Sequence, residues 1–276
     1  MNQNVVTMIL KNGTATGIIQ CNLDEWIGVS YKIPRSKIKE AKDLKDINNT
    51  GVYILLGVDE DTGENRAYIG EAEDIYVRLL QHNKNKEFWS ECIAFVSQDN
   101  SLNKAHIKYI ENKLYTKANK VGRYEIDQIT PTKSSLDDAD EIRAIKFLEK
   151  VILLTSVYGY HMFDEILSEE NKNENNKLLY LNNNNIEYAK GILTDEGFVI
   201  LKGSKIKNEI ANSLSTSLVK YAERERSSKD IKNNVFVNNH LCSTPSMAAV
   251  IILGRNSNGY NEWKNKDGIK LKDLIN

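Results

Sequence analysis

Short apolar runs, separated by polar turns, dominate the first part of the chain and predict strands. Two of these runs flank the turn pair Asn12-Gly13, which is typical of a tight hairpin. Strands are expected at 5–10, 16–20 and 26–32. Together they predict a small β-rich unit over residues 1–45.

The next segment, residues 46–130, mixes strand and helix patterns. Two apolar runs enclose a polar stretch with the turn signal Thr62-Gly63, which predicts a second hairpin. A strong helix pattern places Ile107, Ile110 and Leu114 on one stripe. Strands are expected at 52–57, 67–70 and 92–97, and helices at 74–82 and 102–120.

The remainder of the chain divides into a connector and a second domain. Ser134 or Ser135 is expected to cap a helix that has acidic residues in its first turn and ends near Leu154. The Asn-rich stretch 169–185 has no apolar period, and we interpret it as a linker that ends a helical connector over 131–185. Residues 186–276 then form the second domain, with a strand at 198–201 and a helix at 205–224.

Composition narrows the classes of protein that remain. A chain of 276 residues is long enough for about two domains. Its net charge of −1 means that any nucleic-acid-binding face must be a local patch. The three cysteines, Cys21, Cys92 and Cys242, lie far apart, which favours a reducing cytoplasm over a disulfide framework. No apolar run is long enough to cross a membrane or to serve as a signal peptide.

Several kinds of catalytic site are excluded by their missing motifs. The four histidines show no metal-ligand pairing, and no C-x-x-C occurs, so a structural zinc site is not expected. The sequence also lacks a G-x-S-x-G nucleophile elbow, a phosphate-binding P-loop and a dinucleotide-binding G-x-G-x-x-G after a strand.

What remains is a set of tyrosine, arginine, histidine and glutamate residues. Tyr53 and Tyr68 fall on the two strands of the predicted hairpin. Arg78 and His82 are four residues apart and therefore project from one helix face. Glu111 lies at the edge of a buried stripe, where a carboxylate is costly unless it is paired or bound to a metal. Each residue alone also has an ordinary interpretation, as a strand aromatic or as a surface ion pair.

These residues resemble the GIY-YIG nuclease family. The two halves of its signature stand here as Gly51-Val52-Tyr53 and Tyr68-Ile69-Gly70, and Arg78, His82 and Glu111 follow in the family's order. The similarity covers about residues 46–130. It implies an α+β fold whose nuclease domain has a three-stranded antiparallel sheet with flanking helices.

The resemblance also implies a chemistry, namely metal-dependent hydrolysis of phosphodiester bonds by an endonuclease. Glu111 would bind one Mg²⁺ (or Mn²⁺), and Arg78 would hold the phosphate. Tyr53 would be the general base. Because an unperturbed tyrosine has a pKa of about 10, Tyr53 needs help from a nearby cation, for which His82 is a candidate, from a hydrogen bond with Tyr68, or from the metal-bound water.

One position departs from the family pattern. The asparagine that usually follows the glutamate-bearing helix is missing, and Asp127 and Gln128 stand in that stretch. This departure leaves an alternative function open: a catalytically silent nucleic-acid-binding or adaptor protein that retains the fold.

Basic residues near the predicted site favour nucleic acid, with DNA as the expected partner. Residues 102–124 carry a net charge of +5, in which Glu111 is the only acid. A basic patch of this kind suits a phosphate backbone, although it also fits an ordinary solvated helix face. The predicted nucleic-acid contacts in this region are Lys84, Lys86, Lys104 and Lys108.

The end of the chain has a resemblance of its own. Residues 198–204, 243–249 and 254–259, with Trp263, resemble a bacterial domain of unknown function that often follows nuclease or restriction-type domains. The similarity covers about residues 190–276 and implies a separate α+β domain. Its loop 254–258 is basic, and Ser246 and Arg255 are candidates for binding a phosphate.

Overall fold

The computed structural model describes residues 3–99, 101–167, 178–183 and 186–275. The chain divides into two compact units, residues 1–164 and 165–276. Both units mix helices and strands, so the expectation of an α+β protein is confirmed. No helix within the described residues is both long and apolar enough to pass through a bilayer.

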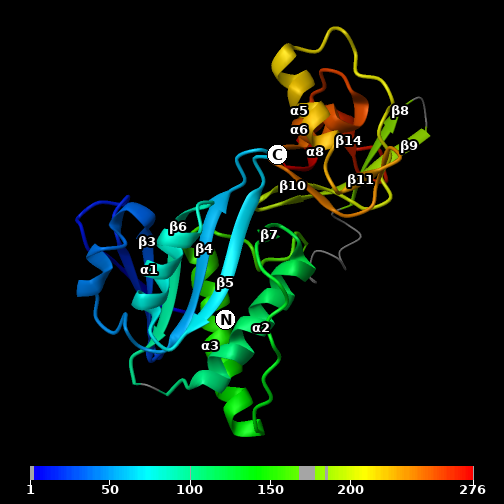
Figure 1. Ribbon diagram of the computed structural model, residues 1–276. Helices are drawn as coiled ribbons and strands as arrows, with labels where there is room; N and C mark the ends of the chain where they lie inside the picture. The colour runs from blue at the N-terminus through cyan, green and yellow to red at the C-terminus, as the bar shows by residue number, and fades with distance from the viewer. Residues whose placement is uncertain (1–2, 100, 168–177, 184–185, 276) are drawn as a thin grey trace. The chain divides into compact units, whose positions relative to one another are not determined.

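Unit 1 is built on one seven-stranded sheet with the order β1-β2-β3-β6-β4-β5-β7. Neighbouring strands are antiparallel except for β5 and β7, which are parallel. The strands are β1 (Val6–Leu10), β2 (Ile19–Leu23), β3 (Gly28–Pro34), β4 (Gly51–Val58), β5 (Asn65–Ala72), β6 (Trp89–Ser97) and β7 (Glu125–Ile126). Figure 1 shows β4 and β5 as a long hairpin near the centre of this unit.

The predicted β-rich piece over residues 1–45 does not form a sheet of its own. Its third strand, β3, pairs with β6 along its whole length, from Gly28↔Ser97 to Pro34↔Glu91. The three-stranded sheet expected for residues 46–130 is therefore the β6-β4-β5 part of a larger sheet. Strand β6 is apolar and buried over most of its length, so both of its edges need a partner.

Helices cover both faces of this sheet. Helix α1 (Ile75–Asn85) packs on one face with Tyr53 and Leu55, whereas α2 (Lys104–Val121) and α3 (Asp138–Val157) pack on the other with Val52 and Ile54. Successive β4 side chains point to opposite faces, and both sets are buried. Two short 3₁₀ helices, η1 (Arg35–Lys37) and η2 (Glu40–Asp43), lie between β3 and β4.

Local capping signals set the ends of these helices. The Asp74 side chain accepts from Val77 N at 2.9 Å at the start of α1, and Asn103 caps α2 in the same way. Gly122 ends α2 in the left-handed conformation, with a φ of 73°. Helix α3 is capped by Asp137, which accepts from Asp140 N, and not by Ser134 or Ser135 as predicted.

Unit 2 contains a five-stranded antiparallel sheet with the order β13-β10-β9-β8-β14. Its core lies between this sheet and the apolar helix α6 (Pro245–Leu253), and includes Phe198 and Trp263. The strands are β8 (Leu179–Asn183), β9 (Ile186–Thr194), β10 (Gly197–Ile200), β13 (His240–Cys242) and β14 (Trp263–Lys264). The remaining elements are α5 (Thr216–Arg226), α7 (Gly259–Glu262), α8 (Leu271–Leu274) and the two-stranded ribbon of β11 (Ile231–Lys232) and β12 (Val235–Phe236).

Two sequence predictions for this region differ from the structure. Part of the predicted linker 169–185 is strand β8, while residues 168–177 and 184–185 lie outside the described residues. The helix expected at 205–224 begins only at Thr216. The backbone N–H groups of Lys205, Ile206 and Lys207 donate to three separate distant segments, so they cannot form helical bonds.

Candidate active site

The two glycines of the Gly51–Tyr53 and Tyr68–Gly70 segments are required by close packing. Tyr53 on β4 is the register partner of Gly70 on β5. A Cβ atom on Gly70 would lie 2.2 Å from the Tyr53 hydroxyl oxygen, and one on Gly51 would lie 2.1 Å from the Phe95 carbonyl oxygen. The Tyr53 ring thus lies across a position on β5 that has no side chain.

Tyr53 is fully buried, and its hydroxyl group is held between two residues of α1. The hydroxyl oxygen lies 2.6 Å from His82 Nε2 and accepts from Arg78 Nε at 3.3 Å. Arg78 and His82 reach it together because they stand one helical turn apart. Burial is the main cause that raises the pKa of Tyr53, and nearby Tyr68 adds to it, while Arg78 opposes the shift.

The imidazole of His82 is neutral at pH 7. Burial, and then the positive charges of Arg78 and Lys86, lower its pKa to about 4. His82 is therefore not a cation that could assist Tyr53, contrary to the prediction from the sequence. A neutral imidazole shares a hydrogen bond with the Tyr53 hydroxyl group, in which Nε2 accepts or donates according to the tautomer.

Tyr68 stands beside this pair on the same face of the sheet. Its ring centroid lies 6.2 Å from that of Tyr53 and 5.0 Å from that of His82. The Lys86 ammonium group lies over the Tyr68 ring, 4.5 Å from its centroid. Tyr68 is half-buried, so its exposed part faces the pocket described below.

Glu111 reaches the same region from α2. Burial raises the pKa of its carboxyl group to about 7, the negative charge of Glu71 contributes, and Arg78 and Lys108 act in the opposite direction. Glu71 is not among the site residues predicted from the sequence. It lies on β5 two residues after Ile69, and this spacing puts it on the face that α2 covers.

A pocket of about 590 Å³ brings these groups together. Four of the five predicted catalytic residues line it, and Tyr53 lies buried behind His82. The lining residues are Tyr68, Arg78, Gln81, His82, Asn85, Lys86, Glu111 and the loop 127–132. The pocket thus lies where α1, the β5 edge and α2 meet.

The predicted nucleic-acid-binding lysines are divided by the fold. Lys86 lines the pocket, and Lys108 is close enough to Glu111 to influence its pKa. Lys104 forms an exposed ion pair with Glu73 at 2.6 Å and does not line the pocket. Lys84 is exposed on α1 and is also absent from the lining.

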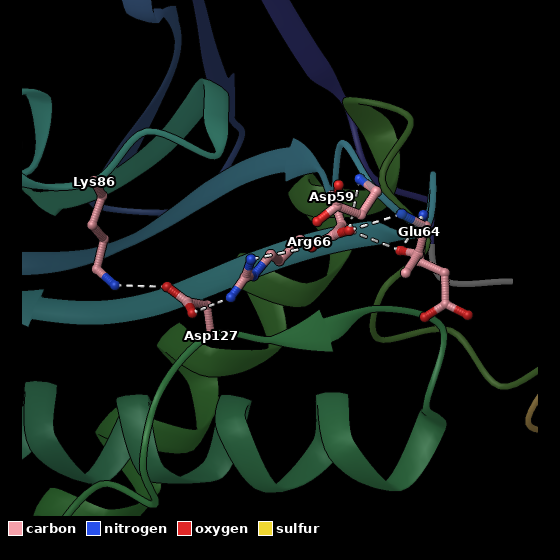
Figure 2. Close-up of polar contacts among 7 residues, drawn as sticks. Asp59, Glu64, Arg66, Lys86 and Asp127 are labelled. Atoms are coloured by element: carbon pink, nitrogen blue, oxygen red, sulfur yellow. Dashed lines mark hydrogen bonds and ion pairs between the residues drawn. The ribbon is translucent and has the colours of Figure 1, made fainter.

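Asp127 and Gln128 hold the loop after α2 in place. They occupy the stretch in which the GIY-YIG nucleases usually have an asparagine. Gln128 Oε1 accepts from Ile69 N at 2.7 Å, which extends the pairing along the β5 edge beyond β7. Asp127 forms ion pairs with Arg66 and Lys86, each at 2.7 Å (Figure 2). Burial raises the pKa of Asp127, but these two cations outweigh burial and leave it below its ordinary value.

The donor set around Glu111 fits a hard divalent cation. Glu111 and Glu71 offer carboxylate oxygens, which suit Mg²⁺ or Mn²⁺. No group of three or more His, Cys, Asp or Glu side chains forms a metal cage in the described part of the chain. Mg²⁺ is commonly held by one or two carboxylates together with substrate phosphates. Burial, and then the negative charge of Glu71, raise the pKa of Glu111, and a bound cation would favour its ionised form.

Arg255 and Ser246 belong to unit 2, and both take part in internal hydrogen bonds. Arg255 forms an ion pair with Glu262 at 2.8 Å and donates to Ser257 Oγ at 3.1 Å. Ser246 Oγ accepts from Gly259 N at 2.9 Å. These internal bonds hold the loop that was predicted to bind phosphate. They explain why its residues are polar without the need for a bound ligand.

Comparison with known proteins identifies only the second unit. Residues 179–275 match the family described as "Domain of unknown function (DUF4357)", which confirms the resemblance noted for the end of the chain. No curated protein and no solved structure matches the chain. The resemblance of residues 46–130 to the nucleases therefore depends on their own sequence and geometry.

Proposed function

We propose that unit 1 is a metal-dependent endonuclease that hydrolyses phosphodiester bonds in nucleic acid, with DNA as the expected substrate. The observation that carries this proposal is the convergence of Tyr68, Arg78, His82 and Glu111 on one pocket from three elements. A phenol, a guanidinium, a neutral imidazole and a carboxylate are the groups that such a reaction needs for proton transfer, phosphate binding and metal binding.

In this mechanism the chain's own residues orient the phosphate and move one proton. Arg78 binds the scissile phosphate and stabilises the charge that develops on it. The Tyr53–His82 pair accepts the proton of the attacking water: in the tautomer whose Nε2–H donates to the Tyr53 hydroxyl oxygen, the neutral His82 keeps an unprotonated Nδ1 that can take this proton, and Tyr53 stabilises the imidazolium that results. Glu111, with Glu71 beside it, would hold the divalent cation, which supplies positive charge to the phosphate and the leaving oxygen.

One observation favours the alternative of a catalytically silent nucleic-acid-binding or adaptor protein. The Tyr53 hydroxyl is buried, and both of its hydrogen-bond partners are protein groups. A general base must reach the proton that it abstracts, directly or through one relay group. In the enzyme, His82 has to be that relay, whereas in a silent protein the same contacts only stabilise the fold.

The decisive experiment is a cleavage assay on single-stranded, duplex and branched DNA and on RNA, with and without Mg²⁺. We expect metal-dependent cleavage by the full chain and its loss in Glu111→Gln. Glu149→Gln, on the exposed side of α3, is the matched control and should cleave normally. Cleavage that persists in Glu111→Gln would point to a contaminating nuclease, and binding without cleavage would favour the silent protein.

For unit 2 we propose an accessory role in holding nucleic acid, in the cytoplasm. Residues 202–232 carry eight cations and four anions. A positive surface of this kind would add electrostatic affinity for a phosphate backbone without reading its sequence. Part of this charge is used internally, because Arg224 pairs with Glu225 and Arg226 donates to the Ile251 carbonyl oxygen.

A further inference from the structure

Ile129 is an exposed apolar side chain at the pocket. Its exposed fraction of 89% is the largest among the large apolar side chains in the part of the chain that the structure describes. Single exposed apolar residues are common on protein surfaces and need no explanation by themselves. Ile129 differs because it lines the same pocket as Arg78 and Glu111.

The backbone on both sides of Ile129 is held in place by hydrogen bonds. Before it, Asp127 N donates to the Ala67 carbonyl oxygen at 2.8 Å, and Gln128 is bonded to β5 as described above. After it, the Pro131 carbonyl oxygen accepts from Asn112 Nδ2 of α2 at 2.8 Å. Since the loop is already ordered, Ile129 can contact a ligand without a large further loss of backbone entropy.

The other residues of the pocket indicate which ligand surface meets Ile129. Arg78 and Lys86 supply positive charge, and the neighbouring residues Gln128, Thr130 and Thr132 are polar. If Arg78 binds a phosphate of the backbone, the two nucleotides that this phosphate joins lie against the wall of the pocket. The faces of the bases are the main apolar surfaces of a nucleic acid, and proteins insert isoleucine and similar side chains between base steps.

We propose that Ile129 is a wedge that packs against the base beside the scissile phosphate. The preferred substrate is then a nucleic acid in which that base is unpaired or easily unstacked, such as a mismatched duplex or a junction with a single strand. This inference rests on the proposed function, since it places the scissile phosphate at Arg78.

The test measures binding in EDTA, so that it does not depend on cleavage. The full chain is titrated with a matched DNA hairpin and with a hairpin that carries one mispaired 2-aminopurine, whose fluorescence reports unstacking. The variants are Ile129→Ala, Ile129→Leu, which keeps an apolar wedge, and Ile142→Ala as control. Ile142 is 56% exposed on α3 and does not line the pocket.

We expect the wild-type chain to bind the mispaired hairpin more tightly and to increase its fluorescence. Ile129→Ala should lose this preference, which is on the order of tenfold to a hundredfold when the mispair removes the cost of unstacking one base step. Ile129→Leu and Ile142→Ala should retain it. If Ile129→Ala still preferred the mispaired hairpin, or if the wild-type chain showed no such preference, the proposal that Ile129 is a wedge would be overturned.

These results are separable from the proposed enzyme activity. Metal-dependent cleavage together with an unchanged preference in Ile129→Ala would leave the nuclease standing and remove the wedge. A preference that depends on Ile129, without any cleavage, would support the wedge in a silent binding protein. Failure to bind any of the nucleic acids would overturn both.

Discussion

Glu111 is a carboxyl group that the fold keeps partly protonated near neutral pH. Burial and the neighbouring charge of Glu71 both favour the neutral acid. A divalent cation favours the ionised form, so binding of the cation and loss of the proton are coupled. Near neutral pH the affinity for metal should therefore follow the protonation state of Glu111.

We predict that affinity for Mn²⁺ rises with pH through about 7, the pKa to which Glu111 is raised. Below that pH the acid is protonated and competes with the metal, and above it the carboxylate is free to bind. Glu71→Gln removes one cause of the raised pKa and should move the midpoint to lower pH. Glu73→Gln, an exposed neighbour paired with Lys104, is the control. A midpoint that Glu71→Gln leaves in place would contradict the electrostatic assignment.

Arg78 is the guanidinium best placed to bind the scissile phosphate. Arg78→Ala should raise the barrier to cleavage by about 3–4 kcal/mol, the size found for one preorganised donor to a transition state. Arg78→Lys should recover only part of the rate because an ammonium group lacks the planar fork. Single-turnover rates measure this effect, with exposed Arg143→Ala on α3 as the control. Rates close to wild type in Arg78→Ala would show that another group binds the phosphate.

The hairpin of β4 and β5 positions the site through the contact between Tyr53 and Gly70. The register of the two strands places these residues opposite each other, and α1 covers the Tyr53 ring from above. The hydroxyl group contacts His82 and Arg78 while the hydroxyl end of the ring lies over Gly70. One missing side chain on β5 thus fixes the position of a phenol on β4.

Gly70→Ala should therefore destabilise unit 1 by about 1–3 kcal/mol, the usual cost of overpacking a core. Denaturant unfolding measures this change. The matched test is the double variant Tyr53→Leu/Gly70→Ala, in which the smaller side chain makes room for the added methyl group. The cost of Gly70→Ala should be lower in that background. Equal costs in both backgrounds would show that the contact with Tyr53 is not the cause.

At the scale of the whole molecule, each unit has hydrophobic cores of its own. The two cores of unit 1 lie on opposite faces of its sheet, and the main core of unit 2 lies under α6. All residues that line the candidate pocket belong to unit 1. Unit 1 therefore supplies every side chain that lines this pocket.

A fragment of residues 1–164 should fold and retain metal-dependent cleavage. Its affinity for nucleic acid should fall if unit 2 contributes electrostatic binding, and this loss should shrink as salt is raised. Binding and cleavage by the fragment and the full chain, measured at two salt concentrations, check both expectations. Unchanged affinity would reject the accessory role of unit 2, and a folded but inactive fragment would show that the site needs it.

The position of the cut matters for this experiment. A fragment that ends at residue 185, the boundary predicted from the sequence, carries β8 without its partners β9 and β14. The unpaired strand would expose backbone groups and apolar side chains such as Leu181, and we expect that fragment to aggregate. The fragment that ends at residue 164 avoids this.

The sequence by itself determined the features that depend on neighbours along the chain. The periods of two and 3.6 residues that reveal strands and helices are local, and so is the capping of α3, although the cap is Asp137 and not the predicted Ser134 or Ser135. The spacing of Arg78 and His82 on one helix face is a property of the same kind. Such interactions are nearly independent of the rest of the fold, so they can be read before it is known.

Only the tertiary structure decided which distant segments meet. Strand β3 extends the sheet beside β6, Lys205 N donates to Tyr188 of β9 instead of starting a helix, and Glu71 of β5 lies close enough to Glu111 of α2 to raise its pKa. The neutral state of His82 has the same origin, because burial and the charges of Arg78 and Lys86 lower its pKa. Burial and electrostatic fields are sums over the whole surrounding volume, and no window of sequence contains them.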